Sequence, residues 1–480
     1  MIFNSIPYAV FFIIFFCLYW YVFRKNVKLQ NLLLLTGSYV FYAWWDWRLL
    51  FLLIAVSLMC YLLGIYIEKA EDFKTKNRLM YTGVWLSVAL LVYFKYTNFF
   101  ILSFAEAFSK LNINLNLQTL HIILPLGISF YTFRNLNYLF DVNKGKAKAT
   151  TDWVIYFSYV SFFPSLISGP IDRAKTLIPQ LEKERKFDYQ LATDGLRQIV
   201  WGLVKKVVVA DNLAPVTNEI FNHYQSFHGS TLLIGAFYFT IQLYADFSGY
   251  SDMAIGFSKL LGFPGTKNFD YPFFSQNIEE YWRKWHISLT SWLSEYIFTP
   301  ASICFRDYEN WGLIISILIT FLVSGFWHGA NWTFVVWGFL NGCYYIPLIL
   351  QGKMNKKKKK GQEVKLWPSF KELRNIVATF TLVVLTNILF RSANIAQAFG
   401  YYKHLFSRSL LLSPLNSKPY LIAFILVFLV IEWVQRDKPH PFQLETIRFR
   451  PLRWALYFVV VYIIFFNISY ENVQFIYAQF

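Results

Sequence analysis

The sequence has little charge. Only 15% of its 480 residues are Asp, Glu, Lys or Arg, whereas a soluble globular protein carries about 25%. Hydrophobic residues make up 56% of the chain, above the usual value of about 45–50%. The apolar segments recur along nearly the whole length and leave no room for a soluble domain. We therefore predict a membrane protein with a single domain over residues 1–480.

Cysteine is also scarce. The chain has four cysteines, each inside or beside an apolar segment: Cys17, Cys60, Cys304 and Cys343. Their number and spacing indicate neither a disulfide framework nor a zinc site. The net charge is +17, but the Lys and Arg residues cluster between apolar runs, as the positive-inside rule expects of cytoplasmic loops. We therefore expect no nucleic-acid partner.

Several catalytic motifs are missing. The chain has no Walker loop, which argues against an ATP-driven pump. It has no G-x-S-x-G elbow, so a serine hydrolase is not expected. It also lacks H-E-x-x-H and any Cys/His cluster at ligand spacing, so we predict neither a metal nor a bound cofactor.

The start of the chain lacks the basic region of a signal peptide. In "MIFNSIPYAVFFIIFFCLYWYVFRKNVK" the positive charges follow the apolar run. That order predicts a first transmembrane helix with its N-terminus outside and Arg24, Lys25 and Lys28 inside.

A membrane-spanning helix needs about 20 mostly apolar residues. The candidate segments are 5–23, 29–45, 48–67, 79–96, 121–141, 153–170, 196–212, 231–257, 312–326, 333–350, 373–391, 420–434 and 454–471. Gly and Pro interrupt several of them, which predicts broken or re-entrant helices covered by protein. We predict an all-α polytopic membrane protein with 11 to 13 membrane-embedded helices.

This domain divides by pattern into four stretches. These are N-terminal helices (1–120), a motif-rich catalytic core (121–350), a basic cytoplasmic loop (353–372) and C-terminal helices (373–480). The run Lys356–Lys360 in the loop suits a solvated linker that fixes orientation, or a site for lipid headgroups or CoA phosphates. The nearly uncharged segment 97–120 suits the outer face.

Ionisable residues in apolar segments are expensive and mark functional sites by default. Asp246 and Asp252 interrupt "IQLYADFSGYSDMAIGFSKLLGF". His286 lies in "NIEEYWRKWHISLTSWLSEYIFTP", predicted as one amphipathic helix that lies along the interface or dips into the protein. His328 lies in "SGFWHGANWTF". Both histidines follow a tryptophan, Trp285 or Trp327.

Burial disfavours the charged imidazole, so a buried histidine stays neutral at cellular pH. A neutral imidazole can take a proton from a hydroxyl that attacks a carbonyl. The same burial keeps water from an activated acyl group. A buried structural histidine is the ordinary alternative, but two of them together with two intramembrane aspartates favour an active site.

Five segments carry a resemblance to a known family: "LPLGISFYTFRNLNYLFDV", "FFPSLISGPIDR", "YADFSGYSDMAIG", "YWRKWHISLTSWLSEYI" and "FWHGANWTFVVWG". Their order resembles that of the membrane-bound O-acyltransferase family. Within it, the chain is most similar to the bacterial branch with the alginate O-acetyltransferase membrane subunit and the peptidoglycan O-acetylation protein. The match covers about residues 1 to 410.

The resemblance implies a conical shell of helices around a tunnel for acyl groups. His328 matches the family's invariant histidine, which implies a role as catalytic base or acyl relay. His286 matches a second histidine of the family, which implies that it positions the donor or shuttles protons. Asp246 and Asp252 match family aspartates that orient a base or brace broken helices. Ser294 and Glu295 replace Arg and Asp of the branch's pattern, so a charge pair expected there is in doubt.

Other residues of these motifs are predicted to support the site. The tryptophans of the His328 motif are expected to wall the tunnel, and its glycines to leave room for a substrate. Arg283 and Lys284 either contact a phosphate or carbonyl of the donor or anchor the interface. The supporting set is completed by Trp285, Trp327, Asn331 and Trp332.

The resemblance implies an O-acetyltransferase of the bacterial inner membrane. It would move acetyl from a cytoplasmic thioester, acetyl-CoA or a carrier-protein thioester, toward an envelope polysaccharide. Members of this branch pass acetyl to an extracytoplasmic acetyltransferase of the SGNH type (AlgJ-like), so we expect such a partner. The alternatives are D-alanyl transfer to teichoic acids and, in other classes, a proton-coupled transporter or a structural scaffold.

Overall fold

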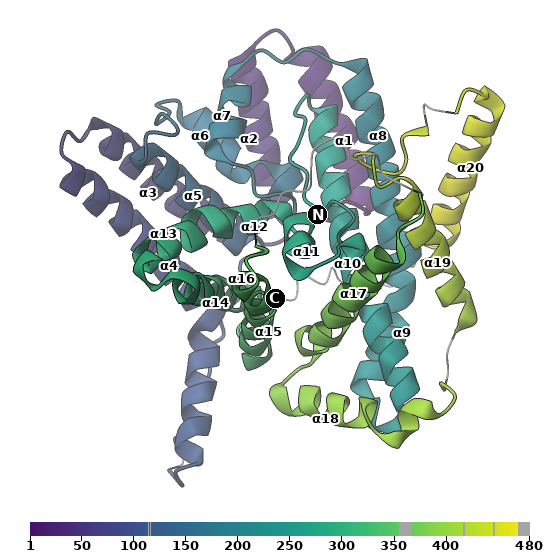
Figure 1. Cartoon of the computed structure of the whole chain (residues 1–480). Coiled ribbons are helices and arrows are strands. Elements are labelled where there is room, and N and C mark those ends of the chain that lie inside the picture. The colour runs from purple at the N-terminus through teal and green to yellow at the C-terminus, as the bar shows by residue number, and fades with distance from the viewer. Residues whose placement is uncertain (114, 116, 355–365, 416–417, 445–446, 469–480) are drawn as a thin grey trace. The chain divides into compact units, whose positions relative to one another are not determined.

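The computed structural model describes all residues except 114, 116, 355–365, 416–417, 445–446 and 469–480. The described residues form helices joined by turns and irregular segments, and no β-strand occurs among them. The predicted all-α polytopic class is therefore confirmed (Figure 1). The basic run Lys356–Lys360 lies outside the described residues.

The chain forms two compact units. The first contains residues 1–196 and 253–266, and the second contains 197–252 and 267–480. The helices that begin in the first unit are α1 (Ile6–Cys17), α2 (Val27–Ala43), α3 (Trp47–Lys69), α4 (Phe73–Ser109), α5 (Ile128–Asn143), α6 (Trp153–Ser161), α7 (Ala174–Glu182) and α8 (Tyr189–Leu203).

The helices that begin in the second unit are α9 (Asp211–Asn222), α10 (Gly229–Leu260), α11 (Ile278–Lys284), α12 (Ile287–Leu293), α13 (Thr299–Cys304), α14 (Glu309–His328), α15 (Trp332–Cys343), α16 (Ile346–Leu350), α17 (Phe370–Arg391), α18 (Ile395–Leu405), α19 (Pro419–Val434) and α20 (Arg450–Phe466). Short 3₁₀ turns connect some of these helices. Among the described residues, three π-helical turns also connect or extend helices, at Leu18–Val22, Val204–Ala210 and Ser294–Phe298.

Side-chain caps fix where the first four helices begin. Ser5, Asn26, Asp46 and Asp72 each accept a hydrogen bond from a backbone N–H of the following first turn. These residue types cap well because a short polar side chain satisfies a donor that has no partner within the helix. The apolar run that follows each cap then sets the length of the helix.

Five described helical segments are long and apolar enough to cross a membrane. They are Trp47–Lys69, Phe73–Ser109, Arg306–His328, Trp332–Leu350 and Phe370–Arg391, with shorter apolar helices at Ile6–Val22 and Tyr420–Val434. Other predicted segments are shorter than the sequence pattern suggested. The segment predicted at 153–170, for example, holds only the nine-residue α6 and then a 3₁₀ turn that contains Pro164.

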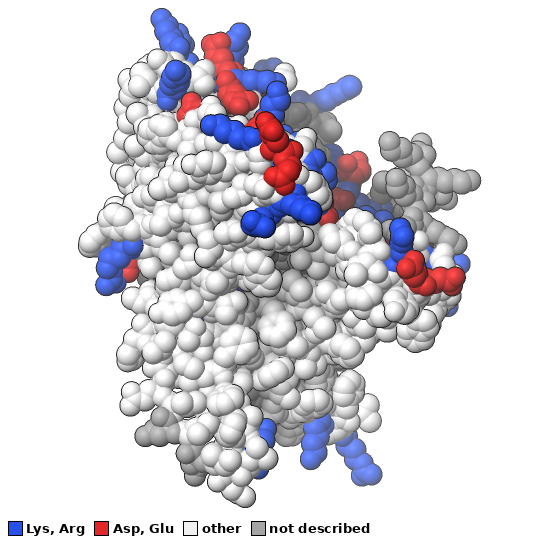
Figure 2. Space-filling view, turned by 90° about the vertical axis from the view of Figure 1, so that its left-hand side faces the viewer, with Lys and Arg blue, Asp and Glu red and all other residues white. Residues whose placement is uncertain are grey.

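Helix α4 is much longer than the predicted segment 79–96. It has 37 residues, about 55 Å at 1.5 Å per residue, because no Gly or Pro stops it after residue 96. Only 6% of its most apolar window is buried by protein, so this surface is apolar and almost free of protein contacts. Figure 2 shows one face of the molecule where white atoms, from residues without charge, fill a broad area between charged edges.

Helix α10 carries the core of the second unit. All ten residues 241–250 are buried, so the polar side chains of this segment face protein and not lipid, as intramembrane polar groups require. Nearby, α15 packs against both α14 and α17. These helices, with α11, position the site described next.

Candidate active site

The stretch "SGFWHGANWTF" forms the end of α14, a tight turn and the start of α15. Helix α14 ends at His328, and Gly329 is extended with φ of −174°. Asn331 caps α15 by accepting a hydrogen bond from the N–H of Thr333 at 3.0 Å. The Asn331 amide also donates to the backbone oxygen of Ala393 at 2.6 Å. This side chain therefore ties the turn to the segment after α17.

The glycines of this stretch serve close packing between α14 and α15. A Cβ at Gly325 would lie 2.3 Å from the backbone oxygen of Phe334, and a Cβ at Gly329 would lie 2.3 Å from the Phe334 ring. Both positions are filled by protein. On this side of each glycine Phe334 takes the space, so the structure gives no support there to the expectation that these glycines leave room for a substrate.

The imidazole of His328 lies in an aromatic cage and is only 4% exposed. Its ring centroid is 4.8 Å from Trp327, 4.9 Å from Trp337 and 5.1 Å from Phe390. These rings come from α14, α15 and α17, so the packing of three helices fixes the orientation of the imidazole.

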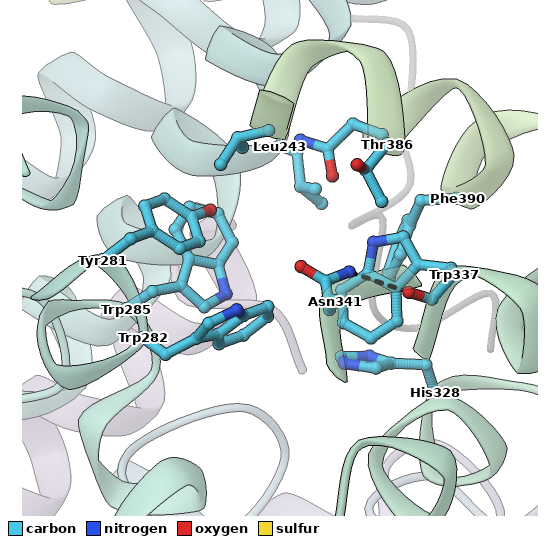
Figure 3. A pocket seen from close by; sticks show the side chains of 11 residues that line it. Leu243, Tyr281, Trp282, Trp285, His328, Trp337, Asn341, Thr386 and Phe390 are labelled. Atoms are coloured by element: carbon cyan, nitrogen blue, oxygen red, sulfur yellow. Dashed lines mark hydrogen bonds between the residues drawn. The ribbon is translucent and has the colours of Figure 1, made fainter. Parts of the chain in front are cut away.

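One side of His328 lines a small cavity of about 10 Å³ (Figure 3). The lining is Leu243, Tyr281, Trp282, Trp285, His328, Trp337, Asn341, Val383, Thr386, Asn387 and Phe390. It is mostly aromatic with a few amide and hydroxyl groups, which is the usual composition of a small-ligand site. Asn341 donates to the backbone oxygen of Trp337 at 2.8 Å, which holds its amide in place.

The helix predicted across the His286 motif is broken at His286 itself. This residue has φ of 42° and ψ of 54°, a left-handed conformation that is rare outside glycine. An extended segment stabilises the corner: the backbone oxygen of Asn268 accepts from the N–H of Ile287 at 2.8 Å, and the N–H of Asp270 donates to Lys284 at 2.9 Å. The motif therefore forms two short helices, α11 and α12.

The side chain of His286 is 1% exposed. Its ring lies 4.6 Å from Phe247 and 5.7 Å from Trp327, and among the described residues neither ring nitrogen has a hydrogen-bond partner. Burial lowers the pKa of His286 to about 3 because water no longer stabilises the charged ring. His286 is not among the residues that line the cavity; the indole of Trp327 contacts both histidines.

Arg283 and Lys284 pair with acidic residues one helical turn earlier. Arg283 lies 3.5 Å from Glu279 and its side chain is 52% exposed, while Lys284 lies 3.2 Å from Glu280. Arg283 and Glu279 line a wider cleft of about 290 Å³ that is partly open to the outside. Trp282 lines both the cleft and the cavity.

Asp246 and Asp252 form ion pairs with two consecutive buried lysines. Lys206 lies 2.8 Å from Asp246, and Lys205 lies 2.5 Å from Asp252. Both lysines belong to the π turn Val204–Ala210 and both are 3% exposed. The aspartates are not among the cavity-lining residues; their contacts join α10 to the turn before α9.

The remaining predicted residues lie in different surroundings. Trp285 lines the cavity, whereas Trp332 is 50% exposed and is not among the cavity-lining residues. Ser294 lies in a π turn and lines the wider cleft. Glu295 follows it in the same turn.

Several cavity residues were missed by the sequence analysis, notably Trp282, Trp337, Asn341 and Asn387. The two asparagines could have been found from the sequence, because burying an amide within an apolar helix is costly and such residues often mark functional sites. The tryptophans carry no such signal in a chain with 17 tryptophans.

A metal centre finds no support in the part of the chain that the structure describes. No group of three His, Cys, Asp or Glu side chains there comes close enough to hold an ion. That the reaction uses no metal stays a prediction.

Comparison with known proteins connects this geometry to a family. The family model for the membrane-bound O-acyltransferase family matches residues 40–390. The chain is 36% identical to a probable alginate O-acetylase of Azotobacter vinelandii, over 85% of this chain and 78% of that protein. It is 32% identical to a peptidoglycan O-acetyltransferase of Helicobacter pylori, over 67% and 64% of the two chains. It is 29% identical to a teichoic acid D-alanyltransferase of Streptococcus thermophilus, over 55% and 68%.

Proposed function

Because this chain belongs to the membrane-bound O-acyltransferase family, a family of multi-pass membrane enzymes, we propose that it O-acetylates a polysaccharide of the bacterial envelope. The enzyme takes acetyl from a cytoplasmic thioester, acetyl-CoA, and moves it across the inner membrane, with its N-terminus outside. Relatives named as alginate and peptidoglycan O-acetylases support the acetyl group and the glycan acceptor.

The observation that carries this proposal is the position of His328, which is 4% exposed, on the wall of the cavity. His328 is the catalytic base. It takes the proton of the acceptor hydroxyl as that oxygen bonds to the thioester carbonyl carbon and the carbonyl electron pair moves onto oxygen. When the intermediate collapses, the C–S bond breaks and the sulfur leaves with the proton from His328. The aromatic cage keeps competing water away from the thioester.

His286 acts as a positioning residue in this proposal. Its contact with Trp327, which also contacts His328, supports this role. Asn268 holds the His286 corner, since its side-chain oxygen accepts from the N–H of Ser288 at 3.2 Å and from the Ser288 hydroxyl at 2.9 Å. A fixed corner keeps the Trp327 indole, and through it the His328 ring, in one orientation.

The lining of the cavity favours acetyl over D-alanyl as the transferred group. A D-alanyl thioester carries an ammonium group, which needs a carboxylate or several acceptors when it leaves water. Among the described side chains that line the cavity none is Asp or Glu. An acetyl group has no charge to compensate. An SGNH-type partner on the outer side would then receive acetyl and place it on the glycan.

The first prediction tests the base. We expect His328→Ala to abolish O-acetylation of envelope glycans in cells, measured by mass analysis of the isolated glycans, because no other described imidazole lines the cavity. His223→Ala is the matched control, since the His223 side chain is 60% exposed. Normal acetylation by a His328→Ala protein that inserts and folds would refute the assignment.

A further inference from the structure

Trp282 carries a buried donor for which the described structure offers no acceptor. The residue is 6% exposed, and its indole Nε1 has no hydrogen-bond partner among the described residues. A buried polar group without a partner costs roughly 1–3 kcal/mol, and each instance in a native protein asks for an explanation. A ligand oxygen is one explanation when such a group lies in a cavity.

Trp282 lies in the cavity opposite the candidate base. It belongs to α11, and Figure 3 shows its indole extending from one wall while the imidazole of His328 lies at the other. The ring of Trp337 contacts both, at 5.6 Å from Trp282 and 4.9 Å from His328. Phe321 supports Trp282 from the other side at 5.3 Å.

Trp282 also borders the wider cleft, because it is a lining residue of both. A thioester whose carbon is attacked beside His328, and whose long thiol arm extends into the cleft, would lie against Trp282, the residue that the two linings share. The indole N–H is therefore a donor beside the space that such a thioester would occupy.

We propose that the Trp282 indole N–H donates a hydrogen bond to the carbonyl oxygen of the acyl group during transfer. The proposal rests on the proposed function. As the acceptor hydroxyl attacks, negative charge gathers on the carbonyl oxygen, and the N–H stabilises it until the C–S bond breaks and the charge leaves with the sulfur. Rings on both sides hold the donor in place, so it needs little reorganisation in the transition state.

A second tryptophan in the same unit provides a matched control. Trp201 is 4% exposed and its Nε1 also lacks a partner in the described structure. It stacks on Phe428 at 6.0 Å and lines neither the cavity nor the cleft. Trp201→Phe therefore makes the same chemical change away from the reaction.

The experiment compares Trp282→Phe and Trp201→Phe in inverted membrane vesicles from the producing cells, supplied with acetyl-CoA labelled in its acetyl group. Label that enters glycan is counted at several donor concentrations. Phenylalanine keeps an aromatic ring at 282 but removes the donor. We expect an apparent kcat about 100-fold lower, the usual effect of losing one such donor, with the apparent KM within about threefold. Trp201→Phe should behave as wild type.

A Trp282→Phe enzyme that keeps more than half of the wild-type kcat, or that changes only KM, would overturn the proposal. If Trp282→Phe does not fold, β-(3-benzothienyl)alanine at position 282 replaces N–H by sulfur within a ring of the same shape, and the same loss of kcat is expected. Absence of transfer by the wild-type vesicles would instead refute the proposed function on which the inference rests.

Discussion

At the scale of single residues, the two histidines show how much the sequence could predict. Tryptophan neighbours marked both His286 and His328 as buried. The sequence did not predict that only His328 lines the cavity, because the break at His286 depends on a left-handed residue that is neither Gly nor Asn. The hydrogen bonds that stabilise this corner come from Asn268, 18 residues earlier in the chain.

The lowered pKa of His286 predicts a loss of stability in acid. Above pH 6.5, its ordinary value, the ring is neutral in both the folded and unfolded chain. As the pH falls toward the folded pKa of about 3, the unfolded chain binds a proton that the folded chain does not. This residue should therefore lower the free energy of unfolding by roughly 1.4 kcal/mol for each pH unit below 6.5, or by about 2 kcal/mol at pH 5.

The measurement is the melting temperature in detergent at pH 7.5 and pH 5. His286→Asn suits the left-handed backbone and should lower the difference between the two temperatures. His223→Asn, which removes a largely exposed ring, should keep the wild-type difference. An unchanged acid sensitivity in His286→Asn would show that His286 is already protonated, or accessible, in the folded protein.

At the scale of helices, the pairing of α10 with the π turn Val204–Ala210 could not be predicted. Asp246 and Asp252 stood out as acidic residues in an apolar segment, but their partners did not. Successive residues of a regular helix point about 100° apart, so two adjacent lysines are not expected to be buried together. Protein encloses this π turn on all sides, since residues 205–210 are all buried, and Lys205 and Lys206 pair with two different aspartates.

The aspartates were expected either to orient a base or to brace broken helices, and variants of these ion pairs distinguish the two roles. Lys205→Met should destabilise the protein by roughly 1–3 kcal/mol, because it leaves the Asp252 carboxylate, whose side chain is only 16% exposed, without its cation. The double variant Lys205→Met with Asp252→Asn should recover most of that loss, since Gln198 can still donate to an oxygen at 252 as it does now at 2.8 Å.

Fluorescence-detected size exclusion after heating measures the stability, and glycan acetylation measures the activity. If Asp252 braces α10, the double variant regains both. Recovery of stability without acetylation would instead show that the charge of Asp252 takes part in the chemistry, and would refute the bracing role.

At the scale of the whole molecule, composition predicted a membrane protein, because its charge is too low and its apolar content too high for a soluble one, and the length of the apolar segments predicted the all-α class. The boundaries of long helices were less predictable. Helix α4 runs to Ser109 through residues that hydropathy assigned to a connection, since helix continuation depends on the absence of a breaker as well as on apolar content. The cavity depends on contacts between α10, α11, α15 and α17 that no local pattern encodes.

The distribution of charge predicts how the first unit crosses the membrane. Basic residues follow α1 and flank the start of α4, while the segment after α4 is nearly uncharged. With the N-terminus outside, α1 to α4 then alternate so that Lys25 and Lys74 lie inside and Asn4 and Leu117 outside, as the positive-inside rule requires. These four side chains are all exposed, so each is open to a labelling reagent.

Single cysteines test this orientation in intact cells with a maleimide that does not cross the inner membrane. The natural cysteines are first replaced by serine. Asn4→Cys and Leu117→Cys should be labelled before lysis, whereas Lys25→Cys and Lys74→Cys should be labelled only after it. The reverse pattern would place the N-terminus inside. It would also place the basic connections on the outer face, against the positive-inside rule. Their positive charge would then indicate a binding surface and not the orientation of the chain in the membrane.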